Sequence, residues 1–251
     1  MRALARAPTR AAAVVLATLA AAPASAQHAW SYKGEHGPDH WAEVSPQYAT
    51  CKVGKHQSPI DIRGASAADL PAVDFSYAPA PLEIVDNGHT IEVDYAPGSF
   101  ITVGGKRYDL VQFHFHHPSE ERIAGQPFPL VAHLVHRGAD GKLAVVAVLF
   151  KEGAPNPVLE GVWEHLPAGE GPPHVIQGAT VDASRLLPAD HRYYTFTGSL
   201  TTPPCTEDVT WFVLATQVEL SKAQEATFAA RYPSNARPVQ PLNGREVRMS
   251  R

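Results

Sequence analysis

The stretch FITVGGKRYDLVQFHFH, residues 100–116, indicates that this chain folds around an antiparallel sheet. Two runs of β-prone residues flank Gly104-Gly105, and glycine readily adopts the positive φ angles that a two-residue hairpin turn needs. The stretch therefore predicts two neighbouring antiparallel strands. The second of these strands ends in alternating aromatic residues and histidines.

Other segments have the same texture. Residues 89–95 (HTIEVDY) alternate apolar and polar side chains, as a half-buried strand does. Residues 129–136 (PLVAHLVH) and 142–150 (KLAVVAVLF) predict a second antiparallel pair, joined by a turn at Asp140-Gly141. The latter segment is apolar on both faces and is expected at the centre of the sheet. Residues 208–220 (DVTWFVLATQVEL) predict one further long strand.

Helix signals are few. Ser221 to Gln224 has the form of a capping box, and Asn156-Pro157 can start a short helix. The 23 prolines and 18 glycines are spread through the chain, which is typical of a sheet-rich domain with many loops. The sequence therefore predicts an α+β, sheet-dominated fold: a single domain built on a large, mainly antiparallel central β-sheet with few short peripheral helices.

The first 26 residues differ from the rest. Three arginines precede an Ala-rich apolar run, and Ala24-Ser25-Ala26 has the small-x-small form of a cleavage site. We interpret residues 1–26 as a signal peptide and residues 27–251 as the mature domain, which would be periplasmic or secreted. The apolar run is too short to span a bilayer comfortably, so no membrane span is expected.

Charge and cysteine content narrow the function classes. Removal of the three arginines leaves 18 basic and 25 acidic residues, a formal net charge of −7. Such an acidic surface argues against nucleic acid or an anionic membrane as partner. Cys51 and Cys205 lack the spacing of a redox or zinc site, and in an oxidising compartment they are expected to form one disulfide.

The histidines carry the candidate chemistry. Side chains alternate along a strand, so Gln112, His114 and His116 share one face, whereas His117 points to the other. If residues 129–136 form the neighbouring strand with matching faces, His133 completes a group of three. Zinc suits three neutral nitrogen ligands with an open fourth position. Histidines also serve as ordinary hydrogen-bonding groups in cores, so the residues alone leave both roles open.

Seven ordered motifs resemble those of the α-class carbonic anhydrases, in particular the exported bacterial kind. In chain order they are WSYKGEHGPDHW, QSPIDI, DNGHT, QFHFHH, AHLVH, GSLTTPPC and RPVQPLNGR. A single motif such as TTPP carries little information, but together they cover nearly the whole mature chain. The resemblance implies an enzyme that hydrates carbon dioxide reversibly to bicarbonate and a proton, with Zn²⁺ as cofactor.

The resemblance also implies the catalytic residues. The zinc ligands fall on His114, His116 and His133. Glu120 would accept a hydrogen bond from the Thr201 hydroxyl, so that the oxygen of Thr201 in turn accepts a hydrogen bond from hydroxide on the zinc. This would aim the lone pair of the hydroxide at carbon dioxide.

Further positions follow from the same resemblance. His89 would be the proton shuttle, because an imidazole titrates near neutral pH. Thr202, Val135, Val145, Leu200 and Trp211 would line the substrate side. Gln112 would orient His114, and Tyr32 and Asn87 would hold the water chain of the shuttle. Cys51 and Cys205 match a disulfide common in exported members.

One position departs from the family pattern. A metal-bound imidazole usually donates its second N–H to a partner, and the family's carboxylate partner for the third ligand falls on Val131, which accepts no hydrogen bond. His133 must then use a backbone carbonyl, water or another side chain. We expect weaker zinc retention and a shifted pKa of the zinc-bound water.

Two other classes fit parts of the pattern. A non-catalytic binding module on the same fold would usually lack a ligand histidine or the threonine, and this chain has them all. A cupin-type metal oxygenase also places H-x-H on strands, but it does not require LTTPP, residues 200–204. The sequence leaves the oligomeric state open, a homodimer included.

Overall fold

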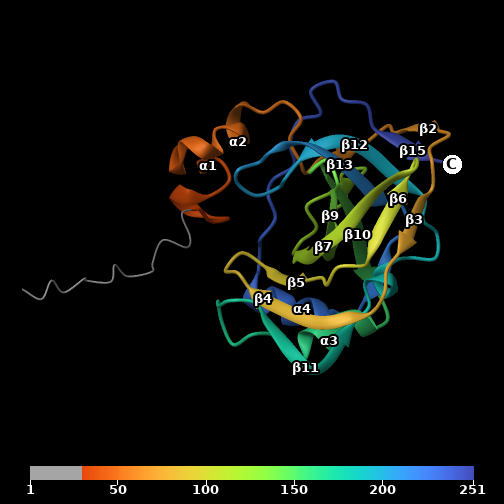
Figure 1. Cartoon of the computed structure of the whole chain (residues 1–251). Coiled ribbons are helices and arrows are strands. Elements are labelled where there is room, and N and C mark those ends of the chain that lie inside the picture. The colour runs from red at the N-terminus through yellow and green to blue at the C-terminus, as the bar shows by residue number, and fades with distance from the viewer. Residues whose placement is uncertain (1–29) are drawn as a thin grey trace, which may run out of the picture.

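The computed structural model describes residues 30–251, so the expected signal peptide lies outside the described residues. Most strands of the described chain belong to one strongly twisted 13-stranded sheet (Figure 1). Two short strands, Asp61–Ile62 and Arg122–Ile123, pair only with each other. The helices are short and lie at the periphery, as predicted. No helix among residues 30–251 is long and apolar enough to cross a membrane.

The helices are α1 (Trp41–Val44), α2 (Thr50–Val53), α3 (Pro157–Trp163) and α4 (Lys222–Arg231), with 3-10 turns at Gly34–His36, Pro46–Tyr48 and Ala183–Leu186. The strands are β1 (Asp61–Ile62), β2 (Ser66–Ala68), β3 (Val73–Ser76), β4 (Ala80–Asp86), β5 (Ile91–Asp94), β6 (Phe100–Val103), β7 (Lys106–His116), β8 (Arg122–Ile123), β9 (Leu130–Gly138), β10 (Leu143–Glu152), β11 (His174–Val181), β12 (Tyr193–Ser199), β13 (Glu207–Leu214), β14 (Val218–Leu220) and β15 (Arg248–Ser250).

The sheet runs in the order β11-β4-β5-β7-β9-β10-β13-β12-β15-β2, with β6 and β3 continuing from β7 and β14 beside β10. Most neighbours are antiparallel, but β10 pairs in parallel with β13 and β14, and β15 with β2. The apolar strand β10 lies at the centre, as its two apolar faces predict.

The predicted hairpins are confirmed. β6 and β7 are antiparallel neighbours across Gly104 and Gly105, whose φ angles are 57° and 78°. β9 and β10 are likewise antiparallel neighbours.

The prediction of one long strand over residues 208–220 is wrong, because the segment divides into β13 and β14. β13 pairs with β10 up to Val213 opposite Ala147, and β14 resumes with Val218 opposite Phe150. Four residues of this segment thus stand opposite two of β10, and the chain must loop out between the two pairings.

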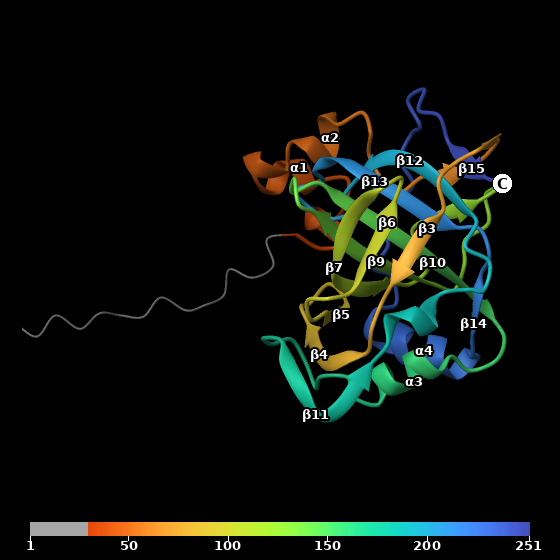
Figure 2. The same ribbon diagram turned by 45° about the vertical axis from the view of Figure 1, so that its right-hand side comes forward.

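Both predicted helix starts are confirmed. Asn156 caps α3 by accepting from two backbone amides, and Ser221 forms a reciprocal capping box with Gln224 at α4. The Gln224 side chain also bonds the backbone of Asn156 in both directions, at 2.8 and 2.7 Å. The two helix starts are therefore tied together, and α3 and α4 lie side by side beneath the sheet (Figure 2).

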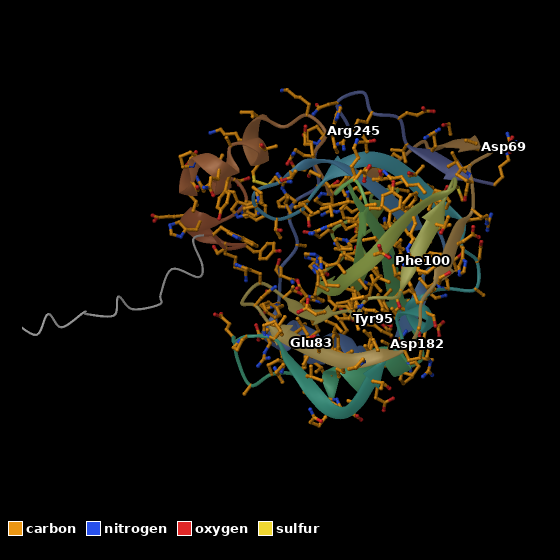
Figure 3. All side chains as sticks on the ribbon, in the orientation of Figure 1. Asp69, Glu83, Tyr95, Phe100, Asp182 and Arg245 are labelled. Carbon is orange, nitrogen blue, oxygen red and sulfur yellow. A yellow bond between two sulfur atoms is a disulfide. The ribbon has the colours of Figure 1, made fainter. Side chains whose placement is uncertain are left out.

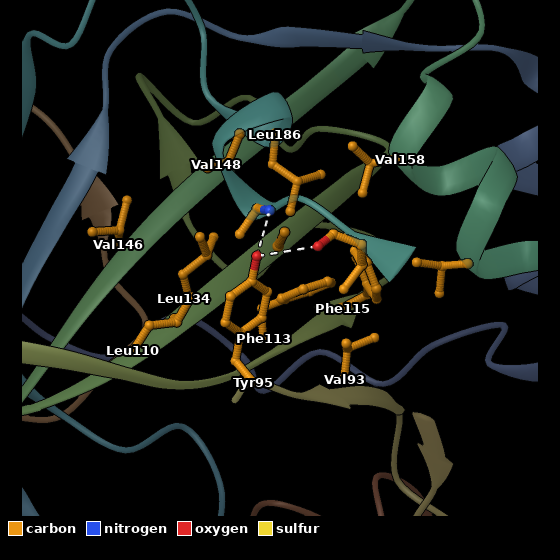
Figure 4. Packing of buried hydrophobic residues seen from close by; sticks show 14 of the residues in the cluster. Val93, Tyr95, Leu110, Phe113, Phe115, Leu134, Val146, Val148, Val158 and Leu186 are labelled. Carbon is orange, nitrogen blue, oxygen red and sulfur yellow. Dashed lines mark hydrogen bonds between the residues drawn. The ribbon is translucent and has the colours of Figure 1, made fainter. Parts of the chain in front are cut away.

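The sheet separates two apolar clusters. One face packs against the helices, through Phe113 and Phe115 of β7 and Phe228 of α4. In this cluster the Tyr95 hydroxyl donates to the carbonyl of Ala78 at 2.7 Å. It also accepts from the amide of Ala183 and lies 3.3 Å from the carbonyl oxygen of Val181 (Figure 4). Side chains fill the space between the elements, with Tyr95 inside and Asp69 at the surface (Figure 3). The other face carries a second cluster around Trp211.

A β-bulge decides which residues of β7 face this second side. The pairing with β9 places Leu110 opposite His136 but Gln112 opposite Val135, so Val111 is the extra residue and is 37% exposed. Before the bulge the even-numbered Leu110 joins the helix-side cluster, and after it the odd-numbered Phe113 does. The bulge therefore turns the even-numbered histidines to the opposite face.

Candidate metal centre

The site residues occupy directly opposed positions on neighbouring strands of the sheet. His114 on β7 lies opposite Glu92 on β5 and opposite His133 on β9. His133 in turn faces the small Ala147 of β10. Because directly opposed residues project to the same face, strand pairing alone brings His114 and His133 together.

The three predicted histidines converge. The ring centroids of His114, His116 and His133 lie 4.7 to 5.5 Å apart, and one ligand atom from each lies within 4.8 Å of the others. His116 and His133 are 1% exposed. His117, by contrast, faces Glu225 and the carbonyl of Pro233.

We call His114, His116 and His133 the histidine triad. In each ring a hydrogen bond engages one nitrogen and leaves the other for a metal. Nδ1 of His114 lies 2.8 Å from Oε1 of Gln112, and Nδ1 of His116 lies 2.8 Å from the carbonyl of Asn235. Nε2 of His116 is buried and has no hydrogen-bond partner among residues 30–251. A buried nitrogen with no partner, aimed at two other imidazoles, fits a cation ligand, and three nitrogen donors suit zinc.

Burial favours the neutral rings that a metal requires. Burial, followed by the charge of His133, lowers the pKa of His114 to about 3. The same two causes hold the pKa of His116 well below its ordinary value. Burial also lowers the pKa of His133, but Glu121, through its charge and hydrogen bond, and then Glu120 outweigh this, so the net shift is upward.

The partner of His133 is Glu121. Nε2 of His133 lies 3.1 Å from both carboxylate oxygens of Glu121, and neither side chain is more than 2% exposed. The sequence left a backbone carbonyl, water or another side chain open as the partner of His133. The structure shows that the partner is a side chain, the carboxylate of Glu121. Val131 is fully buried in the second apolar cluster. Weaker zinc retention was expected because Val131 replaces the carboxylate of the family pattern. Since Glu121 supplies a carboxylate to His133, the reason for that expectation no longer holds.

Glu120 lies under the triad. Its Oε1 accepts the amide N–H of Arg237 at 2.7 Å, and its Oε2 lies 3.6 Å from Nε2 of His116. Burial is the largest influence on this carboxyl and raises its pKa to about 7, against the lowering effects of His133, Thr201 and the Arg237 amide. Thr201 is 5% exposed, and Oε2 of Glu120 is buried without a hydrogen-bond partner among residues 30–251.

An apolar pocket adjoins the triad. Val135, Val145 and Trp211 occupy directly opposed positions on β9, β10 and β13, next to the row of His133. The pocket lining consists of His114, His133, Val135, Val145, Leu200, Thr201, Thr202 and Trp211. The five substrate-side positions are therefore together beside the triad, and their roles stay predictions.

His89 lies on the turn before β5, and its carbonyl accepts from Asn235, whose own carbonyl bonds Nδ1 of His116. The side chain of Asn87 accepts the backbone amides of His89 and Thr90, both at 3.0 Å, so Asn87 shapes the turn that presents the ring. The Tyr32 ring lies 6.4 Å from the His89 ring, edge to face. Sequence reasoning missed Trp30, which stacks on His89 at 3.6 Å and 7°. Its position in the WSYKGEHGPDHW motif was the available signal.

The predicted disulfide joins Cys51 to Cys205. Cys205 closes the loop that carries Thr201, and its amide donates to the carbonyl of Thr202 at 2.9 Å.

Known proteins are similar to this chain in sequence and in fold. The family model for eukaryotic-type carbonic anhydrase matches residues 36–251. A carbonic anhydrase from Nostoc sp. is 45% identical over 223 residues, 87% of this chain and 84% of that protein. A hyperthermostable carbonic anhydrase from a hydrothermal vent chimney has a TM-score of 0.86 and 46% identity, covering 88% of this chain and 100% of that one. The α-carbonic anhydrase of Thermovibrio ammonificans, solved with the inhibitor sulfanilamide, has a TM-score of 0.84 and 44% identity over 88% of this chain and 98% of that one.

Proposed function

The chain belongs to the α-class carbonic anhydrases, and from that premise we propose that it hydrates carbon dioxide to bicarbonate and a proton with a zinc ion held by His114, His116 and His133. The observation that carries the proposal is the convergence of three imidazoles, two of them buried, beside an apolar pocket that His114 and His133 help to line. Apolar walls suit a substrate without charge, and neutral imidazoles suit zinc.

Zinc would supply the nucleophile, because in carbonic anhydrases as a class it lowers the pKa of a bound water from near 16 to about 7. Among the chain's own residues, Glu120 would act first. The backbone amide of Arg237 donates to its Oε1 and holds that oxygen in place. An ionised carboxylate only accepts hydrogen bonds, so it makes the Thr201 hydroxyl donate to it. The oxygen of Thr201 is then an acceptor toward the pocket. A cation in the triad would favour this ionised form of Glu120.

Carbon dioxide would lie against Val135, Val145, Leu200 and Trp211, with Thr202 at the polar side. His89 would carry the product proton to solvent, since its side chain is partly exposed and an imidazole exchanges protons near neutral pH. Stacking on Trp30 would hold the ring in one orientation. Tyr32 and Asn87 would support the water chain and the turn.

We also propose that the protein is exported, with residues 1–26 removed as a signal peptide. The disulfide supports this, because such bonds persist in oxidising compartments. In the periplasm or outside the cell the partners would be carbon dioxide and bicarbonate, not nucleic acid or a membrane.

A matched pair of histidine variants tests the function. His116→Ala removes a triad nitrogen, whereas His117→Ala changes the next residue, which faces α4. We expect His116→Ala to lose zinc and to lower stopped-flow carbon dioxide hydration by at least about a hundredfold. His117→Ala should keep both within about twofold. Metal content by mass spectrometry and inhibition by a sulfonamide complete the assay.

The same assay separates the alternatives. Purified protein that holds zinc but hydrates no carbon dioxide would favour the non-catalytic binding module. Iron in place of zinc would favour a metal oxygenase. Equal losses in the His116 and His117 variants would contradict the assignment of the triad.

A further inference from the structure

Glu121 is a buried carboxylate that no motif explains. Its side chain is fully inaccessible, and no partner other than His133 hydrogen-bonds its carboxylate among residues 30–251. Burying a carboxylate costs several kcal/mol unless a close partner compensates it. A glutamate at this place is therefore favoured only by its contact with His133.

That contact determines which nitrogen of His133 faces the triad. His114 and His116 engage their Nδ1 atoms with Gln112 and Asn235, which leaves Nε2 of each for the shared point. His133 is reversed, because its Nε2 faces Glu121 and its Nδ1 is left. A carboxylate at Nε2 keeps the proton on that nitrogen, so Nδ1 presents its lone pair.

The backbone around Glu121 is fixed on both sides. The Ser119 hydroxyl donates to the carbonyl of Glu121 at 2.8 Å and accepts the amide of Phe128 at 2.9 Å. The next residues form β8, which pairs with β1. The carboxylate thus approaches His133 from a loop held by hydrogen bonds, and little ordering remains when a metal binds.

We infer that Glu121 is the positioning residue for the metal ligand His133, taking from a loop the role that the family pattern places at position 131 on the strand. The inference rests on the proposed function only in taking the triad as a metal site. Val131 lies two residues before His133 on the same face of β9, opposite His116. A carboxylate at position 131 is therefore expected to reach the same nitrogen of His133.

Moving the charge between the two positions tests this directly. Glu121→Gln keeps the size of the side chain and removes its charge, and we expect zinc transfer to an excess of chelator to become about 10–100-fold faster. The double variant Glu121→Gln/Val131→Glu should return the rate to within about threefold of the unsubstituted chain. Glu121→Gln/Val131→Gln is the matched control, with the same bulk and no charge, and should not restore it.

Two further measurements separate positioning from general stability. The melting temperature of the metal-free protein should be similar in Glu121→Gln and the unsubstituted chain, while the increase on adding zinc should shrink. In the unsubstituted metal-free chain, at a pH high enough to leave His133 neutral, nitrogen NMR of labelled histidines should report the His133 proton on Nε2. This spectrum decides the point even if a variant fails to fold.

Each outcome bears on a different claim. Zinc release at the unsubstituted rate from Glu121→Gln, rescue by Val131→Gln, or His133 protonated only at Nδ1 would overturn the role of Glu121 while carbon dioxide hydration stands. A folded chain with the Nε2–H tautomer that neither retains zinc nor hydrates carbon dioxide would overturn the proposed function instead.

Discussion

Among single residues, Glu92 on the strand next to the triad is expected to make the stability of the fold depend on pH. Its carboxylate accepts from Nε2 of Gln112 at 3.1 Å, and Gln112 in turn bonds His114. Burial, followed by the charge and hydrogen bond of Asp94, raises the pKa of Glu92 from 4.5 to about 7. The folded state therefore holds this proton more tightly than the unfolded chain does.

A pH dependence of stability follows with a definite sign. Because the folded pKa of Glu92 is raised, its contribution is fully present below the unfolded value near 4.5 and is lost as pH rises through about 7. Glu92→Gln should leave the melting temperature unchanged near pH 4 and raise it by roughly 2–4 °C at pH 8, about 1 kcal/mol. Calorimetry across this range measures it, with Glu160→Gln on the exposed side of α3 as control. A constant difference between Glu92→Gln and the unsubstituted protein at all pH values would contradict the assignment.

At the scale of elements, the disulfide ties α2 to the loop between β12 and β13. Cys51 lies in α2, and Cys205 ends the loop that carries Thr201. Arg237 reinforces the same junction, because its side chain donates to the carbonyl of Cys51 at 3.0 Å while its amide holds Glu120. The elements that hold the predicted catalytic threonine and glutamate thus share one anchor.

Loss of this bond should destabilise the whole fold. The cysteines are 154 residues apart, and closing so long a loop contributes roughly 4–5 kcal/mol in the chain-entropy model. We expect Cys51→Ser/Cys205→Ser to melt at least about 10 °C lower, with a smaller loss of activity at low temperature. The double variant's own melting should not respond to reductant, which serves as the control. If reductant leaves the melting of the unsubstituted chain unchanged, the bond is not formed in solution.

Across the whole molecule, the N-terminal segment reaches the predicted site, because Trp30 stacks on His89. The proposed cleavage point after Ala26 lies only a few residues earlier. The mature chain would therefore start just before a segment that contributes to the site.

Expression with export should yield a protein that begins at Gln27, because signal peptidase requires small residues one and three positions before the cut. Intact-mass spectrometry of the periplasmic fraction measures this. Ala26→Phe should accumulate as precursor, and a conservative Ala26→Ser control should be processed. Recovery of the unsubstituted chain with residues 1–26 attached and with free thiols would contradict export.

Local pattern was sufficient for much of the fold. The glycine pair predicted the β6–β7 hairpin, the doubly apolar run predicted central β10, and the cap residues predicted α3 and α4. Alternation on β7 placed His114 and His116 on one face. These features depend on neighbours a few residues apart, whose geometry is set by backbone dihedrals and side-chain periodicity.

Tertiary structure decided the rest, because register and loop approach depend on residues far apart in sequence. The bulge at Val111 exists only through the pairing of β7 with β9. The division of residues 208–220 follows from their pairing with β10. Residue order alone showed that His133 needed a hydrogen-bond partner other than residue 131, and only folding brought the carboxylate of Glu121 from a neighbouring loop to supply it.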